Sequence, residues 1–316
     1  YLKKRNLNNK TIEEFNLGYV PFVSKTFSEL KSKFQEKSLK DSGLFYLDER
    51  KNEYVDRFRG RLIFPIYSLT GKPIAVGGRI IEENKKIAKY INSPETNFFK
   101  KGNNLYNLNK ARKVSNKYNE VYLVEGYMDV ISLHNNQISN CVANLGTALT
   151  SKQILLLGQF FSEIIICFDG DESGYRAALR AAENSLKFLQ PEKQISFLFL
   201  HEGEDPDSYV KKKGKEQFLK YSDDNRIQIH KFIFNHYLNN SKKTPTELAM
   251  IEKKLKILSN SIEDSVVKKY VLGYFLDQLS NLLPFKINMD NKNYKTTNKK
   301  SLEITKNIYK LTQNFS

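Results

Sequence analysis

The middle of the chain alternates short apolar runs with amphipathic stretches. Four apolar runs, at residues 121–126, 141–146, 163–170 and 194–200, have the length of buried strands. Between and after them, residues 127–136, 150–161 and 172–189 have the pattern of helices, and Thr150 is placed to cap the second of them. Strands that alternate with helices predict a parallel sheet with helices on both faces.

The flanking segments follow other patterns. Helical stretches near residues 11–16 and 26–38 precede a strand-rich region in which residues 68–71 form a hairpin turn. After residue 222 the pattern is mostly helical, and residues 244–247 (TPTE) predict a helix cap, a first-turn proline and a capping-box glutamate. We expect a basic α+β subdomain at 1–117, an α/β subdomain at 118–222, a helical subdomain at 223–285 and a polar linker or tail at 286–316.

Charge divides the chain into three segments. Residues 1–117 contain 25 Lys and Arg against 12 Asp and Glu, residues 118–210 contain 5 against 13, and residues 211–316 contain 21 against 10. Frequent lysine alone explains the net charge of +16 but not the acidic centre. A basic–acidic–basic chain predicts a polyanion bound by the flanks and cations bound in the middle.

Several classes of protein are excluded by composition. No run approaches the ~20 apolar residues that span a bilayer, and no leader with a cleavage site opens the chain, so we expect a cytoplasmic protein. Because the chain begins at Tyr1 and not Met, we expect a piece of something longer. The two cysteines, Cys141 and Cys167, lie in apolar runs and are expected as buried thiols, and the four scattered His do not predict a zinc site.

Acidic residues follow three of the predicted strands. Glu125 ends the first, Asp169 and Asp171 follow the third, and Asp205 and Asp207 follow the fourth. Because the carboxyl ends of parallel strands share one edge of a sheet, we expect these acids to converge. Two unit charges ~4 Å apart repel by roughly 4 kcal/mol at an effective dielectric of 20.

Two arrangements relieve such repulsion: a shared proton with a raised pKa, or a hard divalent cation, Mg²⁺ or Mn²⁺. The Asp-x-Asp spacing favours the cation, because it sends two carboxylates to one side of an extended loop. The plainer alternatives are a turn for Asp169-Gly170-Asp171 and a capped helix start for Asp205-Pro206-Asp207.

A known family shares these motifs in the same order. An acid after the first strand and Asp-x-Asp after the third resemble the TOPRIM domain of topoisomerases, some nucleases and primases. The neighbouring motifs resemble the bacterial DnaG-type primase from about residue 1 to at least residue 218, and less through the C-terminal helices. They are RFRGRLIFPI (57–66), GGR (77–79), KYINSPET (89–96), KG (101–102), VEGYMD (124–129), NLGT (144–147), DGD (169–171) and GEDPD (203–207).

The resemblance implies the polymerase core of a primase, in which a TOPRIM-type parallel sheet joins nucleoside triphosphates into RNA on single-stranded DNA. Two or more Mg²⁺ or Mn²⁺ ions are then expected on Glu125, Asp169, Asp171, Asp205 and Asp207, with no zinc in this piece. Glu125, Asp169 and Asp171 are the expected catalytic residues. Asp129, Asn144 and Gly170 are further candidates; Asp129 is alternatively a solvated helix acid, and Asn144 is alternatively part of a turn.

Basic residues of the first segment are the expected nucleic-acid and nucleotide contacts. Arg57, Arg59 and Arg61 alternate with apolar residues, which predicts an extended run with the arginines on one side; a plain solvated strand face is the alternative. Cations, an aromatic ring and an amide suit a nucleotide or single strand. The remaining members of this predicted set are Arg5, Arg79, Lys89, Tyr90, Asn92 and Lys101.

The resemblance also predicts the binding partners of the chain and the alternative functions to be tested against primer synthesis. Expected partners are the template, the nucleoside triphosphates and an RNA–DNA hybrid product, bound by a monomer at a bacterial replication fork. The zinc-binding module and the helicase-contacting module of the family are expected only in segments outside this chain. The rival hypotheses are a topoisomerase fragment or TOPRIM nuclease that cleaves DNA, and a non-catalytic nucleic-acid-binding domain.

Overall fold

The computed structural model describes residues 1–82, 87–169 and 171–282. The chain divides into two compact units, Tyr1–Phe275 and Leu276–Ser316. Of the second unit the structure describes residues 276–282, which include the end of helix α12 (Ser265–Ser280). Among the helices described, none has both the length and the apolar character needed to cross a bilayer.

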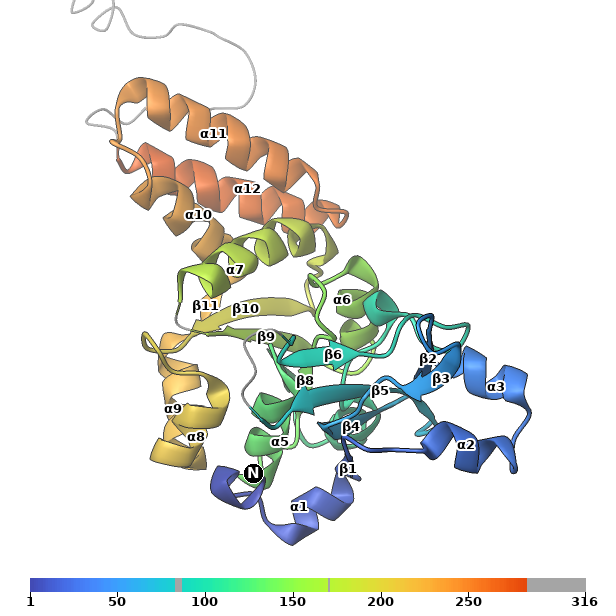
Figure 1. Cartoon of the computed structure of the whole chain (residues 1–316). Helices are drawn as coiled ribbons and strands as arrows, with labels where there is room; N and C mark the ends of the chain where they lie inside the picture. The colour runs from blue at the N-terminus through green and yellow to red at the C-terminus, as the bar shows by residue number, and fades with distance from the viewer. Residues whose placement is uncertain (83–86, 170, 283–316) are drawn as a thin grey trace, which may run out of the picture. The chain divides into compact units, whose positions relative to one another are not determined.

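A five-stranded, mostly parallel sheet forms the centre of the first unit, as the sequence predicts (Figure 1). Its strands lie in the order β11-β10-β9-β7-β8. The four parallel strands are β7 (Glu120–Val124), β8 (Cys141–Ala143), β9 (Glu163–Phe168) and β10 (Gln194–Phe199). The antiparallel edge strand β11 (Ile227–Gln228) was not predicted, because two residues carry no periodicity.

Helices cover both faces of this sheet (Figure 1). One face carries α5 (Tyr127–Asn135), α8 (Pro206–Lys213) and α9 (Lys215–Asn225), and the other carries α6 (Ser151–Gly158), α7 (Glu172–Ser185) with its extension η4 (Leu186–Phe188), and α10 (Ile229–Asn239). Strands between two helical layers bury side chains on both sides, which explains the continuous apolar runs. Cys141 and Cys167 are buried there as free thiols, as predicted.

Local capping sets where the helices begin. The Thr150 hydroxyl accepts from the backbone N–H of Gln153 at 3.2 Å, and the Gln153 side chain accepts from the Thr150 N–H at 3.0 Å, which closes a capping box at α6. Helix α11 (Pro245–Asn260) begins at the predicted cap Thr244, but Glu247 accepts instead from the Ser241 hydroxyl at 2.9 Å.

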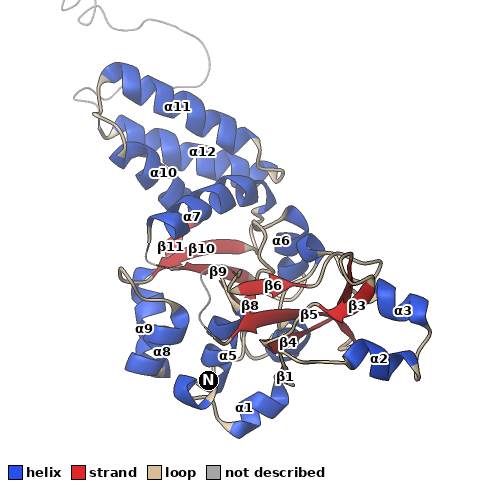
Figure 2. Ribbon diagram, viewed as in Figure 1, coloured by secondary structure: helices blue, strands red, loops and turns tan. Residues whose placement is uncertain are grey.

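The first part of the chain forms a mixed antiparallel region (Figure 2). A four-stranded sheet has the order β1-β4-β5-β6, and β2 pairs with β3. The predicted turn joins β4 to β5, where Gly71 has a φ of +84° and donates to the Ser68 carbonyl at 2.9 Å. The bounds are β1 (Gly18–Val20), β2 (Phe45–Asp48), β3 (Glu53–Asp56), β4 (Arg61–Tyr67), β5 (Pro73–Ile80) and β6 (Tyr90–Asn92), with short helices η1 (Lys3–Arg5), α1 (Asn9–Glu14), α2 (Thr26–Lys31), α3 (Glu36–Asp41), η2 (Lys101–Asn103), α4 (Leu108–Ala111) and η3 (Arg112–Val114).

The predicted division at residues 117/118, 222/223 and 285/286 stays a prediction. Its last part, residues 286–316, lies outside the described residues.

Candidate active site at the carboxyl edge of the central sheet

Glu125 and Asp169 meet because strands β7 and β9 are parallel neighbours. The Asp169 backbone N–H donates to the Glu125 carboxylate at 3.3 Å. Strand β7 is also where the strand order reverses, since β8 lies on its other side and the helices that follow β7 and β9 cover opposite faces. Ligands of open α/β sheets bind beyond the strand ends at such a point.

Crowding and burial perturb these two acids. Burial, and then the charges of Glu125, Asp205 and Asp171, raise the pKa of Asp169 to about 7. Burial and the charge of Asp171 raise the pKa of Glu125, against the hydrogen bond from the Asp169 N–H. The Asp169 Oδ1 atom is buried and has no hydrogen-bond partner within the described chain. A hard cation would neutralise this group, so the donor set fits Mg²⁺ or Mn²⁺.

Asp171 and Asp205 each cap a helix. For Asp205 this is the capped helix start that was named above as the alternative to a metal site. The Asp171 Oδ1 accepts from the Gly174 N–H at 2.6 Å at the start of α7. The Asp205 Oδ1 accepts from the Ser208 N–H at 2.7 Å at the start of α8. Each cap uses one carboxylate oxygen and fixes the side chain at the sheet edge, which leaves Oδ2 for a ligand.

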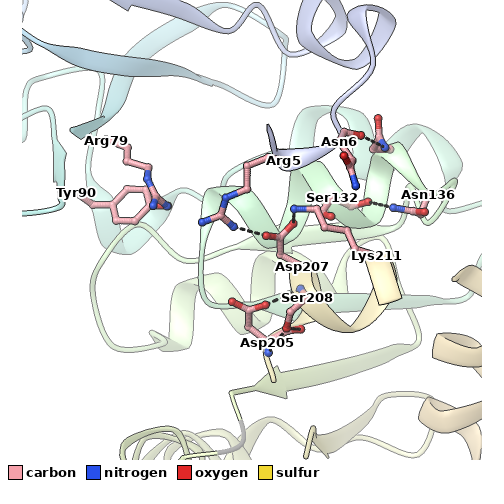
Figure 3. A network of polar contacts seen from close by, with 11 residues as sticks. Arg5, Asn6, Arg79, Tyr90, Ser132, Asn136, Asp205, Asp207, Ser208 and Lys211 are labelled. Carbon is pink, nitrogen blue, oxygen red and sulfur yellow. Dashed lines mark hydrogen bonds and ion pairs between the residues drawn. The ribbon is translucent and has the colours of Figure 1, made fainter. Parts of the chain in front are cut away.

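Asp207 is held by cations (Figure 3). Its side chain is 3% exposed and lies 2.5 Å from both Arg5 Nη1 and Lys211 Nζ. Within residues 1–82, 87–169 and 171–282, no three His, Cys, Asp or Glu side chains are arranged to hold a metal ion. The engagement of Asp207 gives one physical reason, since two positive charges already neutralise it. Its predicted metal role would require these pairs to open.

Asp129 is buried, so the alternative of a solvated helix acid is wrong. Its Oδ2 accepts from the Gly126 N–H at 2.9 Å at the start of α5. Burial, and then the charges of Asp205, Asp169 and Asp207, raise its pKa well above the ordinary value.

A cavity of about 340 Å³ joins these acids to a cationic wall, and its volume lies within the range of ligand sites. The acids lie beyond the carboxyl ends of β7, β9 and β10, and the cations lie in η1, in β5 and directly before β6. The lining includes Arg5, Arg79, Lys89, Tyr90, Asn92, Glu125, Asp129, Asn144, Asp169, Asp205 and Asp207. The structure therefore brings together most of the predicted residues.

Tyr90 and Arg79 form one stacked unit of this wall (Figure 3). The Arg79 guanidinium donates to the Tyr90 hydroxyl at 2.6 Å and lies 4.8 Å from the ring centroid of Tyr1. The glycines before Arg79 leave room for neighbouring rings, since a Cβ on Gly77 would lie 2.5 Å from the Tyr127 ring. An arginine held between aromatic rings presents its charge in a fixed position.

Asn92 lines the cavity while its amide binds other parts of the protein. Its Oδ1 accepts from the Tyr127 hydroxyl at 2.5 Å, and its Nδ2 donates to the Leu145 carbonyl at 2.7 Å. Asn92 thereby ties β6 to α5 and to the loop after β8. Its predicted nucleotide contact stays a prediction.

The predicted extended run of arginines is wrong. Residues 57–60 form a turn between β3 and β4, in which Gly60 has a φ of +69°. Arg57 donates to the Gly43 carbonyl at 3.2 Å, Arg59 donates to the Tyr46 hydroxyl at 3.2 Å, and Arg61 is buried. Burial lowers the pKa of Arg61.

Not all predicted residues lie at this cavity. Arg57, Arg59, Arg61, Lys101 and Asp171 are absent from its described lining. The nucleic-acid contacts predicted for the arginines and Lys101 stay predictions. Gly170 lies outside the described residues.

The sequence reasoning missed Tyr1, Tyr127 and Lys211. Lys211 was detectable, because it follows Asp207 by four residues in the helix that the alternative of a capped start at Asp205 implies. Tyr1 and Tyr127 carry no such local signal, because their partners Arg79 and Asn92 are distant in sequence.

Comparison with known proteins identifies relatives of this chain. Residues 1–112 match the family of the DNA primase catalytic core, N-terminal domain, and residues 119–199 match the Toprim domain. The chain is similar to the DNA primase of Haemophilus influenzae, with 35% identity over 313 residues that cover 95% of the chain and 52% of the relative. It is 38% identical to the DNA primase of Rickettsia conorii over 286 residues, 88% of the chain and 47% of the relative. The chain thus spans about half the length of these curated relatives.

Solved structures resemble the chain over most of their length. A DNA primase domain from Pseudomonas aeruginosa has a TM-score of 0.82 and 35% identity, over 89% of this chain and 87% of that one. The E. coli primase catalytic core has a TM-score of 0.83 and 33% identity, over 92% and 91%. A DnaG primase catalytic domain bound to single-stranded DNA has a TM-score of 0.80 and 34% identity, over 88% and 89%.

Proposed function

The chain belongs to the bacterial DNA primase family, within its catalytic core, and on this basis we propose that it synthesises short RNA primers on single-stranded DNA. The observation that supports this proposal most directly is one cavity, in which acids from the ends of β7, β9 and β10 face cations from the first part of the chain. Nucleotidyl transfer needs acids that bind metal and, opposite them, cations that bind phosphate. The solved relative bound to single-stranded DNA supports the template as a ligand.

The reaction joins two nucleotides. A 3′-hydroxyl attacks the α-phosphate of a nucleoside triphosphate, the new O–P bond forms, and the bond to the β-phosphate breaks so that pyrophosphate leaves with its electrons. The Glu125 carboxylate is positioned at the sheet edge to receive the hydroxyl proton. Arg5, Arg79 and Lys89 hold the triphosphate, and Tyr90 packs against the nucleotide.

Divalent metal, Mg²⁺ or Mn²⁺, would be held by Glu125, Asp169, Asp171 and Asp205. The bound ion would neutralise the charge that develops on the transferred phosphate. The buried, unpartnered oxygen of Asp169 supports this assignment within the described residues. Asp207 joins the set only if Arg5 and Lys211 turn to the triphosphate or the template.

The partners follow from the same proposal. The core binds template, triphosphates and the RNA–DNA hybrid as a monomer in the bacterial cytoplasm at the replication fork. The relatives extend well beyond this chain, so a zinc-binding module and a helicase contact are proposed for other segments of the full protein.

The test compares Asp169→Asn with a matched control, Asp41→Asn, at an exposed acid that ends α3. We expect template-directed incorporation of labelled ribonucleotides to fall about 10³-fold in the first variant, since several kcal/mol of charge stabilisation are lost. The control should keep wild-type activity. Unchanged incorporation in Asp169→Asn would refute the catalytic assignment.

The same experiment distinguishes primer synthesis from the alternative activities. Cleavage of the labelled template without synthesis would identify a nuclease, and a trapped covalent protein–DNA adduct would identify a topoisomerase. Template binding without any turnover by the wild type would leave a nucleic-acid-binding domain. The primase relatives do not favour these alternatives.

A further inference from the structure

A second cavity, of about 310 Å³, lies against the same sheet edge. It shares Glu125, Asn144 and Gly146 with the acidic cavity. Its remaining lining comes from β9, α7 and the loop after β8, whereas α5, α8, β5 and β6 line the acidic cavity. Because α7 and α5 cover opposite faces of the sheet, Glu125 stands between two cavities.

The second cavity has the chemistry of a nucleotide site with a single phosphate. Arg180 is its one cation among the described lining residues, compared with Arg5, Arg79 and Lys89 in the first. Arg180 is exposed, and its guanidinium makes neither an ion pair nor a hydrogen bond with any residue that the structure describes. A free guanidinium at a cavity rim suits one phosphodiester.

The rest of the lining suits a base and its sugar. The apolar part of the lining includes Ile166, Phe168 and two alanines of α7, Ala177 and Ala181, whose small side chains leave room on that side. The Asn144 Oδ1 is buried and lacks a hydrogen-bond partner among the described residues. An apolar wall with a few free polar groups is typical of ligand sites, and an aromatic ring offers a face for base stacking.

We propose that this second cavity binds the nucleotide that carries the attacking 3′-hydroxyl, with Arg180 on its phosphate, while the first cavity binds the triphosphate under attack. The inference rests on the proposed function and deepens it. A reaction that joins two nucleotides needs one on each side of the acids, and Glu125 is the acid that both cavities share. Arg180 acts here as a positioning residue.

The kinetic test uses a short RNA primer annealed to template, with primer and triphosphate varied separately. We expect Arg180→Ala to raise the KM for the primer about tenfold, through loss of one charge-assisted hydrogen bond, and to leave the KM for the triphosphate unchanged. Arg180→Lys should recover most of the affinity because it keeps the charge. Lys89→Ala should show the reverse pattern. Arg176→Ala is the matched control, one turn earlier on α7 and paired with Glu172.

A second measurement does not depend on turnover. A primer with 4-thiouridine as its 3′-terminal base is annealed to template, irradiated with the full 316-residue chain, and the crosslinked peptides are mapped. The proposal predicts crosslinks within residues 144–149 or 177–184. Crosslinks confined to residues 79–92, or a primer KM unaffected by Arg180→Ala, would overturn it. Absence of synthesis by the wild type would refute the proposed function separately, because the crosslink position reports only on the subsite.

Discussion

Gly174→Ala adds one methyl group next to the backbone of Asp169 and the side chain of Asp171. Gly174 is the third residue of α7, and a Cβ there would lie 2.6 Å from the Asp169 carbonyl oxygen and 3.3 Å from Asp171 Oδ1. Ordinary contacts begin at 3.4 Å, so the start of α7 and the end of β9 must separate by the difference, 0.8 Å. Both neighbours are held in place, one as backbone and the other as the helix cap.

The expected effect is larger on activity than on stability. Overpacking costs ~1–3 kcal/mol, and the better helix propensity of alanine returns ~1 kcal/mol, so the free energy of unfolding should fall by no more than ~2 kcal/mol. A displacement near 1 Å of catalytic groups can reduce the rate by ~10²-fold. We therefore expect kcat/KM for primer extension to fall by about 10–100-fold.

Gly273→Ala is the matched control, because Gly273 lies inside α12 and, its own helix backbone apart, no atom of the described residues lies within 4 Å of the added Cβ. It should stabilise the protein by ~0.5–1 kcal/mol and leave activity unchanged. Urea unfolding and primer extension are measured on both variants. Equal activities would refute the inference that Gly174 sets the spacing of Asp169 and Asp171.

Three further perturbations test other parts of the site. Asp207→Asn removes the buried charge between its two cations and should lower the free energy of unfolding by ~3 kcal/mol, measured in urea, with a loss below 1 kcal/mol arguing against the buried pairs. The pKa of Asp169 is raised to about 7 by burial and neighbouring acids, whereas an unfolded Asp titrates near ~3.9. The folded state therefore binds the extra proton between these values, and the contribution of this group to stability is full below about pH 4 and is lost as pH rises through 7. Without divalent ions, Asp169→Asn should raise the Tm at pH 8 but not at pH 4, and Mg²⁺ should raise the Tm of only the wild type at pH 8; equal Tm values at pH 8 would contradict this sign. Tyr127→Phe leaves Oδ1 of the half-buried Asn92 without its donor and should cost ~1 kcal/mol, and a double-mutant cycle with Asn92→Ala should show coupling, with additive effects as the contrary result.

The central sheet and the meeting of Glu125 with Asp169 were predictable because chain connectivity fixes them. Parallel strands joined by helices end at one edge, so residues that follow adjacent strands converge whatever the details of packing. The arginines at 57–61 show the limit of the same reasoning. Alternation with apolar residues is also compatible with a turn, and residues 57–60 form such a turn, with Gly60 in the left-handed region.

The two Asp-x-Asp motifs show why spacing alone did not assign roles. Asp171 and Asp205 both cap helices, so the first motif places its capping acid second and the other places it first. The role of the remaining acid in each motif is then set by residues that are distant in the sequence. Asp169 faces Glu125 and keeps an unpartnered oxygen among the described residues, which calls for a cation from outside the chain. Asp207 meets Arg5, 202 residues away in sequence, and has its cation within the protein. A metal ion added to the core should therefore bind first at the end of β9, and only a ligand that draws Arg5 and Lys211 away from Asp207 should extend the metal site to that residue.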